Sequence, residues 1–369
     1  YLSSPRYGED LNLTIDLRLQ FIAYRELKAA VNSHQAVSGS LIMLDAKTGE
    51  ILAMVNQPSF NPNSGDKQQN TMRNRAVVDA YEPGSTIKPF TALAALESGR
   101  YTPETIIDTA PGYFKVGNKL IEDPINRKSL SLGQSIQKSS QVAFAKLALD
   151  LEQDAIFDVL ARAGLGNYVG VELPGEAYGK LSNAQLKYPV VRATLAYGYG
   201  LSVSPIQLAQ AYLTIASHGL RLPISIVKSD VPDTGERVFE VQATKDVLTM
   251  MELVTAREGT AAKAAVSGYR VAGKTGTARM IGANGYDDER HISWFAGVAP
   301  VSDPKVVMII VINEAKAGRS GGGKVAAPVF ARVAERSLRL LGVSPDKVDV
   351  DLARAPTEAS APIGFGGRG

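Results

Sequence analysis

The stretch from Tyr81 to Gly99, YEPGSTIKPFTALAALESG, most constrains how this 369-residue chain can fold, because it is apolar on nearly every side. A helix that is apolar all round is usually buried. Gly99 stands where a left-handed C-cap would end such a helix. The first turn carries Ser85 and Lys88, which are three residues apart and therefore lie on one side of the helix. A hydroxyl and an amine at the start of a buried helix suggest a nucleophile beside its base.

The composition argues against several classes of function. A formal net charge of +3 is small for this length and gives no reason to expect a nucleic-acid partner. The chain has no cysteine, which excludes thiol catalysis and cysteine-ligated metals. Its histidines, His34, His218 and His291, do not cluster in the sequence, so we expect no metal site and no cofactor. The longest apolar run, over residues 306–312, is too short to span a membrane.

The remaining sequence predicts a mixture of helices and strands. Residues 11–15 alternate like a strand, and Asp16 can cap the helix that follows. Two strands at 40–44 and 51–55 are joined by the turn Lys47-Thr48-Gly49-Glu50. Helical patterns cover 131–166 with a break at Ser139-Ser140, 205–216, 242–257 and 330–341, and strand-like patterns cover 269–272, 293–298 and 305–312.

The spacing Ser-x-x-Lys carries little information by itself, because it occurs six times, starting at Ser64, Ser85, Ser135, Ser225, Ser302 and Ser344. The other copies fall in polar turns, in a strand-like run or late in a helix, where a solvated pair is the simpler interpretation. Ser85 alone opens a wholly apolar helix. The context therefore selects Ser85 as the candidate nucleophile and Lys88 as its base.

Lys-Thr-Gly occurs twice, and the copy at Lys47 is interpreted as a hairpin turn. The second copy, Lys274-Thr275-Gly276-Thr277, continues a strand-like run, and a glycine in a strand often marks close approach of another backbone or a ligand. The same region, GYRVAGKT at 268–275, also matches the phosphate-binding pattern G-x-x-x-x-G-K-[ST]. That pattern needs a helix directly afterwards, whereas Gly282 and Asn284-Gly285 lead into another strand, so the ATP-binding hypothesis is rejected.

A third piece is Ser139-Ser140-Gln141, which begins a helix, so either serine could be only an N-cap. A Ser-His-Asp hydrolase is disfavoured, because the sequence has no G-x-S-x-G elbow and His291 has a simpler interpretation as a residue facing solvent or a neighbouring strand. Three pieces thus follow one another in the chain: a hydroxyl-amine pair, a serine with an amide two residues on, and a Lys-Thr-Gly strand.

These pieces resemble the active-site motifs of the penicillin-binding proteins and serine β-lactamases. The resemblance is strongest to class B penicillin-binding proteins, and within them to the septal D,D-transpeptidase of Gram-negative bacteria, and it covers roughly residues 10–342. The supporting stretches are LTIDLRLQ at 13–20, NQPSFNPN at 56–63, RNRAVVDAYEPGSTIKPF at 73–90, LAYGYGLSVSPIQLAQAY at 195–212, INEAKAG at 312–318 and VAAPVF at 325–330.

The resemblance implies an α/β fold of the α+β kind, with an antiparallel sheet flanked by helices and a mainly helical subdomain at roughly 85–200. It implies a transpeptidase domain over 1–345, followed by a tail over 346–369 whose composition predicts disorder. In the family a membrane anchor and a further domain precede this part. We therefore expect a truncated, soluble part of an enzyme that is anchored at the periplasmic face of the bacterial inner membrane.

The resemblance also implies a mechanism in which Ser85 attacks the carbonyl of a D-Ala-D-Ala stem peptide and neutral Lys88 takes its proton. A free lysine has a pKa near 10.4, so the site must lower it by roughly 3, which corresponds to about 4 kcal/mol. Burial, the positive end of the helix and Lys274 all act in this direction. Ser139 relays a proton to the leaving amine, and the backbone N–H groups of Ser85 and Thr277 form the oxyanion hole.

The strand Lys274-Thr275-Gly276-Thr277 binds the substrate in this implied mechanism, with its lysine and threonines holding the carboxylate. β-Lactams acylate the same serine. Gln141 stands where the family has an asparagine whose amide binds the substrate peptide and the catalytic lysine. The loop Arg319-Ser320-Gly321-Gly322-Gly323-Lys324 lacks an aromatic pair that the family commonly has there. Both departures predict an altered β-lactam profile.

Two alternatives to the transpeptidase remain open at this point. A serine β-lactamase would need a residue that activates a deacylating water, and no residue can be assigned to that role. A penicillin-binding sensor or scaffold of the division complex would acylate but turn over poorly, and Gln141 is compatible with it. The expected partners are stem peptides, β-lactams and cell-division proteins.

Overall fold

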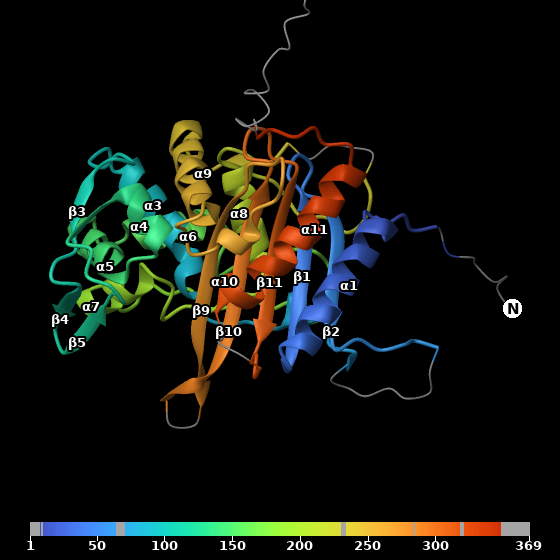
Figure 1. Ribbon diagram of the computed structural model, residues 1–369, viewed down its shortest axis with the longest axis horizontal. Helices are drawn as coiled ribbons and strands as arrows, with labels where there is room; N and C mark the ends of the chain where they lie inside the picture. Colours follow the sequence, from blue (N-terminus) through green and yellow to red (C-terminus); the bar gives the residue numbers. More distant parts are fainter. Residues whose placement is uncertain are drawn as a thin grey trace, which may run out of the picture.

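The computed structural model describes residue 8 and residues 10–63, 71–229, 234–282, 285–317 and 321–347, and its main feature is a five-stranded antiparallel sheet (Figure 1). The strand order is β2-β1-β11-β10-β9, which leaves β9 at one edge. These strands are β1 (Ser38–Asp45), β2 (Ile51–Gln57), β9 (Ala272–Gly282), β10 (Gly285–Ala299) and β11 (Val306–Asn313). Three short strand pairs lie outside the sheet: β3 (Ile106–Asp108) with β6 (Ser129–Ser131), β4 (Tyr113–Val116) with β5 (Lys119–Glu122), and β7 (Leu220–Arg221) with β8 (Glu236–Arg237).

Helices cover both faces of the sheet and gather beside its β9 edge. Figure 1 shows α1 and α11 in front of the sheet and α8 behind it, with α3 to α7 beyond β9. The helices are α1 (Leu17–Ser33), α2 (Arg75–Val78), α3 (Lys88–Glu97), α4 (Leu132–Lys138), α5 (Gln141–Asp150), α6 (Ala155–Arg162), α7 (Pro189–Leu195), α8 (Pro205–Ala216), α9 (Val241–Thr255), α10 (Gly322–Val325) and α11 (Ala327–Leu340), with the 3-10 turns η2 (Gly84–Ile87) and η3 (Ala262–Ala264). The predicted fold class, an antiparallel sheet flanked by helices, is confirmed.

The centre of the sheet forms the core. Every residue of β1 and β11 is buried, and the two strands pair in register from Ser38 with Asn313 to Asp45 with Val306. Strands buried on both faces read as continuous apolar runs, and β11 (VVMIIVIN) is one. The prediction for α1 is also confirmed, since the Asp16 carboxylate accepts hydrogen bonds from two backbone N–H groups of its first turn.

Two predicted strands are wrong. Residues 11–15 form only an isolated bridge, between Leu13 and Val227. Thr14 N donates to Ile226 O, but Asp16 N already donates to Leu52 O on a different segment, so the pairing does not extend into a strand. The strand predicted to begin at Tyr269 begins at Ala272 instead, since Tyr269 N donates to Val266 O and Arg270 N to the Asp346 carboxylate.

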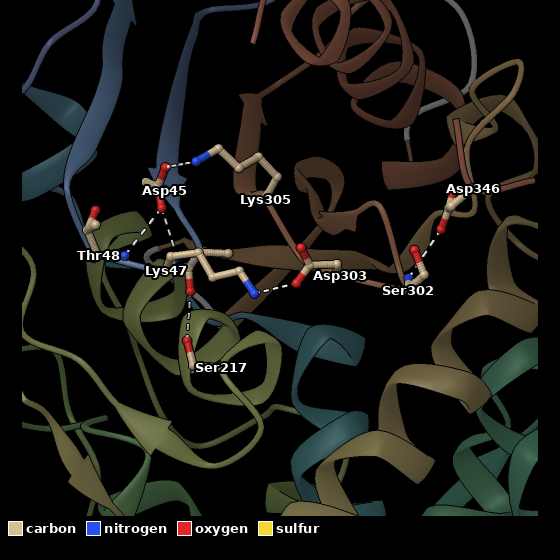
Figure 2. A network of polar contacts seen from close by, with 9 residues as sticks. Asp45, Lys47, Thr48, Ser217, Ser302, Asp303, Lys305 and Asp346 are labelled. Atoms are coloured by element: carbon tan, nitrogen blue, oxygen red, sulfur yellow. Dashed lines mark hydrogen bonds and ion pairs between the residues drawn. The ribbon is translucent and has the colours of Figure 1, made fainter. Parts of the chain in front are cut away.

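The first Lys-Thr-Gly copy is a structural turn, as predicted (Figure 2). The Asp45 carboxylate accepts hydrogen bonds from Lys47 N at 2.8 Å and Thr48 N at 3.2 Å, and it forms an ion pair with Lys305 at 2.6 Å. The Lys47 amine pairs with Asp303 on the loop before β11. This lysine is therefore part of the β1-β2 hairpin and has its own counterion.

Some predictions fall on residues that the structure does not describe. They are Ser64 of the first Ser-x-x-Lys copy, the loop residues Arg319 and Ser320, and residues 348–369 of the predicted tail. Within the described part of the chain, no helix has the length and apolar content that a bilayer crossing requires.

Candidate active site

The opening helix is buried as the sequence predicts, but it begins with a tighter turn. Gly84 to Ile87 form the 3-10 turn η2, and α3 starts at Lys88. Ser85 is half-buried on this turn, one helical turn before Lys88, whose side chain is fully buried. Gly99 follows the helix with a φ of +70°, and its N–H donates to Leu96 O, which confirms the predicted left-handed end.

The lysine amines of two distant segments meet at one serine. The Lys88 amine donates to Ser139 O at 2.5 Å and to Ser139 Oγ at 3.1 Å. The Lys274 amine donates to the same Ser139 Oγ at 3.0 Å. Lys274 is fully buried like Lys88. The structure thus brings Lys88, Ser139 and Lys274 within hydrogen-bond distance, whereas it gives no hydrogen bond between the Ser85 hydroxyl and either amine.

Burial changes the protonation of both lysines. It lowers the pKa of Lys88 to about 7, and the negative charge of Asp123 acts in the opposite direction. Burial and the charge of Lys88 lower the pKa of Lys274 well below its ordinary value. Of the causes expected from the sequence, burial is the one that lowers the pKa of Lys88, since a charged amine is costly to bury, whereas the charge of Lys274 is not among its causes. The pair can supply a neutral amine at neutral pH.

Ser139 occupies a bend between two helices. It ends α4 in a left-handed conformation, with φ 57° and ψ 40°, and Ser140 then caps α5 by accepting a hydrogen bond from Ala143 N at 2.9 Å. A left-handed conformation in a residue other than glycine is uncommon and often marks a functional site. Of the two serines that the sequence left as possible N-caps, Ser140 is the cap, and Ser139 faces the lysines.

Asp123, which follows β5, is a site residue that the sequence analysis missed. Its carboxylate accepts hydrogen bonds from the Ser140 hydroxyl at 2.5 Å, from Gln141 N at 2.6 Å and from Val142 N at 3.3 Å. It therefore fixes the first turn of α5, where Gln141 stands with a half-buried side chain. Its local sequence carries no signal for this role, because the three donors lie at least 17 residues further on.

The second Lys-Thr-Gly copy lies in β9, as predicted, and glycines let η2 approach it. A Cβ on Gly276 would lie 2.6 Å from Pro83 O and 2.9 Å from Thr86 Cγ2. A Cβ on Gly84 would lie 3.2 Å from Thr277 O. The backbones that carry Ser85 and Thr277 are therefore in close contact. Thr275 lies inside β9, which continues to Gly282, so no helix directly follows the Gly-Lys-Thr sequence, in agreement with the rejection of the ATP-binding hypothesis.

The aromatic side chains around η2 hold this approach in place. The Trp294 indole N–H on β10 donates to Glu82 O at 3.2 Å, and the buried Tyr212 hydroxyl on α8 donates to Thr86 O at 2.8 Å. Gly198 supports the turn from the other side, since its carbonyl accepts a hydrogen bond from Gly84 N at 3.2 Å. Three segments that are far apart in the sequence thus position the turn that carries Ser85.

Comparison with known proteins identifies the family of this chain. Residues 39–335 match the family described as penicillin binding protein transpeptidase domain. The chain is 42% identical over 341 residues to the peptidoglycan D,D-transpeptidase FtsI of Escherichia coli strain K12, covering 92% of this chain and 58% of that protein. It is 40% identical over 346 residues to the probable peptidoglycan D,D-transpeptidase PenA of Neisseria flavescens, covering 94% of this chain and 86% of that protein.

A solved structure is similar over nearly the whole chain. The transpeptidase domain of penicillin-binding protein 3 from Burkholderia pseudomallei superposes with a TM-score of 0.84 at 38% identity, covering 94% of this chain and 100% of that one. The family match and the superposition define a transpeptidase domain. The chain belongs to the penicillin-binding protein transpeptidase family, and the resemblance predicted from its motifs is confirmed. It spans 58% of the length of the E. coli relative.

Proposed function

We propose that this chain carries the D,D-transpeptidase activity that cross-links peptidoglycan stem peptides through an acyl-enzyme on Ser85. The observation that carries the proposal is the hydrogen-bonded chain from the Lys88 amine to Ser139 Oγ and on to the Lys274 amine. An amine with a pKa of about 7 is neutral in about half of the molecules at neutral pH, as a general base requires. Ser85 lies on the 3-10 turn that leads into the buried helix, three residues before Lys88.

The acylation step moves one proton and exchanges one bond. Ser85 Oγ attacks the carbonyl carbon between the two D-alanines, and its proton passes to neutral Lys88. The backbone N–H groups of Ser85 and Thr277 stabilise the oxyanion, where the loss of one donor typically costs about 2.7–4 kcal/mol. The C–N bond then breaks, Ser139 relays a proton to the leaving amine, and D-alanine departs.

Substrate binding is assigned to the strand and to the start of α5. Thr275 and Thr277, with Gly276 between them, and the Lys274 amine hold the substrate carboxylate. The Gln141 amide binds the peptide backbone. In support, Thr277 is exposed on β9, and Lys274 and Gln141 both lie in segments that contact or flank Ser139.

The wider setting is part of the same proposal. We assign residues 1–345 to the transpeptidase domain and roughly 85–200 to its helical subdomain, in keeping with the elements that gather beyond β9 (Figure 1). The full-length enzyme would act in septal synthesis at the periplasmic face of the inner membrane, held there by an anchor and working with cell-division proteins. Its substrates would be stem peptides, and β-lactams would inhibit it.

Intact mass spectrometry during incubation with benzylpenicillin tests the proposal. A stable adduct on Ser85, mapped by peptide digestion, is the expected result. Rapid loss of the adduct would indicate a β-lactamase instead, and no adduct at all would overturn the assignment of the site. The variant Ser85→Ala should form no adduct, whereas Ser344→Ala, from an exposed Ser-x-x-Lys copy, should react like the wild type.

Transfer of the acyl group separates the transpeptidase from a penicillin-binding sensor. A sensor would form the same adduct with benzylpenicillin but would not pass the acyl group of a D-Ala-D-Ala peptide or thioester to an amine. A transpeptidase would release a new amide product, detectable by mass. Failure to detect any such product, with the adduct on Ser85 intact, would favour the sensor.

A further inference from the structure

A cavity of about 350 Å³ opens beside β9, and the mechanism proposed above uses only its Thr275 and Thr277 wall. Thr275 and Thr277 form one wall. The loop before η3, η3 itself and the N-terminal part of α10 form the others, through Gly259, Thr260, Ala262, Lys263, Gly321, Gly322, Gly323 and Lys324. Since α10 contacts β9, β10 and η3, these walls belong to one continuous site.

The cavity is lined by positive charge without a compensating acid. Lys263 and Lys324 are both exposed, and neither forms an ion pair with any residue that the structure describes. Among the residues that the structure describes, no acidic residue lines the cavity. The nearest acid in the sequence of this loop, Glu258, turns to Lys138 instead, at 3.4 Å. Threonine hydroxyls and unpaired ammonium groups together favour an anionic ligand.

Glycines place the second lysine at this wall. A Cβ on Gly322 would lie 2.0 Å from Trp294 O, and one on Gly323 would lie 2.2 Å from Thr260 O. The backbone of α10 can therefore press against β10 and the loop before η3 only with glycine at these positions. Lys324 follows at once, so its side chain stands over the same space as Lys263.

Acyl transfer itself indicates what this space must hold. The leaving amine and the attacking amine occupy the same place relative to the acyl carbon, because attack and departure are the reverse of each other. In the proposed function the leaving amine is that of D-alanine, whose carboxylate Thr275 and Thr277 hold. An attacking amine that carries a neighbouring carboxylate would be held in the same way, and the rest of its molecule would extend past these threonines.

We infer that the cavity is the acceptor subsite, and that Lys263 and Lys324 select an acceptor with a second anionic group beyond the carboxylate next to its amine. This inference rests on the proposed function. The acceptor nitrogen attacks the ester carbonyl of acylated Ser85, a C–N bond forms, and the bond from the carbonyl carbon to Ser85 Oγ breaks. One proton of the amine passes to Ser85 Oγ, so the free serine is regenerated.

Acceptor competition with D-amino acids tests the inference. Acyl transfer from a D-Ala-D-Ala peptide or thioester donor is followed by mass with D-glutamate, D-glutamine and D-lysine, which differ mainly in side-chain charge. One charge about 7 Å from a lysine in water changes a rate by about threefold. The expected order is D-glutamate, then D-glutamine, then D-lysine, and 0.5 M salt should reduce the differences because it screens exposed charges.

Matched variants assign the effect to the two lysines. Lys324→Gln and Lys263→Gln should each reduce the preference for D-glutamate over D-glutamine about threefold. Lys28→Gln, an exposed lysine on α1, makes the same change in net charge and should leave the preference unchanged. Thermal unfolding of all three variants verifies that they are folded.

The outcomes separate this inference from the proposed function. Equal transfer to D-glutamate and D-lysine, or a loss of preference in Lys28→Gln as large as in Lys324→Gln, would overturn the inference while the adduct on Ser85 still supports the proposed function. An adduct without transfer to any of the three acceptors would overturn it as well. No acyl-enzyme at all would overturn both.

Discussion

The rate of acylation of Ser85 should follow the titration of Lys88. Burial lowers the pKa of Lys88 to about 7. With that value, about 9% of the molecules carry a neutral amine at pH 6 and about 91% at pH 8. The rate should therefore rise about tenfold between these pH values and level off above pH 8. A lysine with the ordinary pKa of 10.5 would give about a hundredfold rise over the same interval without levelling off.

The measurement is the second-order acylation rate constant, followed by stopped flow with a chromogenic β-lactam that has no titrating group between pH 5.5 and 9.5. Below saturation this constant reports the pKa of the free enzyme. Because Lys274 is a buried neighbour with a lowered pKa, the apparent value belongs to the pair of amines. A rate that still increases tenfold per pH unit above pH 8.5 would refute the argument that burial of Lys88 supplies the base.

The variant Asp123→Asn tests in which direction the acylation curve shifts along the pH axis when a nearby negative charge is removed. The negative charge of Asp123 acts against burial and raises the pKa of Lys88, so its removal should move the rise in rate to lower pH. Asparagine keeps an oxygen that can accept from Gln141 N, which preserves the start of α5. Glu104→Gln, an exposed carboxylate with the same change in charge, should leave the curve in place. A shift to higher pH in Asp123→Asn would contradict the electrostatic assignment.

Three further predictions concern the same site. Lys88→Met should abolish acylation. In urea unfolding the wild type should gain stability relative to this variant as pH rises from 7 to 10, because unfolded Lys88 keeps its proton to about 10.5 whereas folded Lys88 releases it at about 7. The full effect is about 5 kcal/mol, and a stability difference that stays constant with pH would contradict it. Gly276→Ala should lower the free energy of unfolding by about 1–3 kcal/mol and slow acylation, since its Cβ would meet Pro83 O at 2.6 Å. In the control Gly282→Ala, on the same strand, the nearest neighbour of the Cβ is 3.6 Å away, so stability and acylation rate should stay unchanged. Gln141→Asn should change the acylation rates of a β-lactam panel, and an unchanged profile would show that the added methylene is immaterial.

Local features of the fold followed from the sequence where one residue type decides the geometry. Asp16 caps α1 with its own carboxylate, Gly99 takes the left-handed conformation that ends the opening helix, and α8 has the predicted bounds. In each case the deciding contact lies within about four residues. The predicted strand at 11–15 is wrong for the opposite reason: its geometry depends on distant partners, since Thr14 bonds to Ile226 and Asp16 to Leu52, so alternation alone did not make a strand.

The candidate site also contains residues that the sequence could predict and residues that it could not. Ser85 and Lys88 could be selected because the helix that carries them is apolar throughout, a property visible in one short segment. The roles of Asp123 and of the cavity beside β9 could not be predicted from the sequence, because each arises where separate segments meet. Nothing near Asp123 in the sequence indicates that three donors of the α5 start converge on it. Likewise, Lys263 and Lys324 become neighbours of one cavity only after β9 and α10 pack together.

The bend at Ser139 makes the positions of Lys88 and Ser139 depend on each other. A left-handed conformation in a serine costs of order 1–3 kcal/mol and persists only when its surroundings fix it. Here the Ser139 N–H donates to Ile136 O, and its carbonyl accepts the Lys88 amine at 2.5 Å. The following residue is tied to Asp123. The same amine that would take the proton of Ser85 therefore also holds the bend that directs the Ser139 hydroxyl toward Lys274. A substitution of Lys88 would therefore remove the proposed base and loosen the proposed relay together.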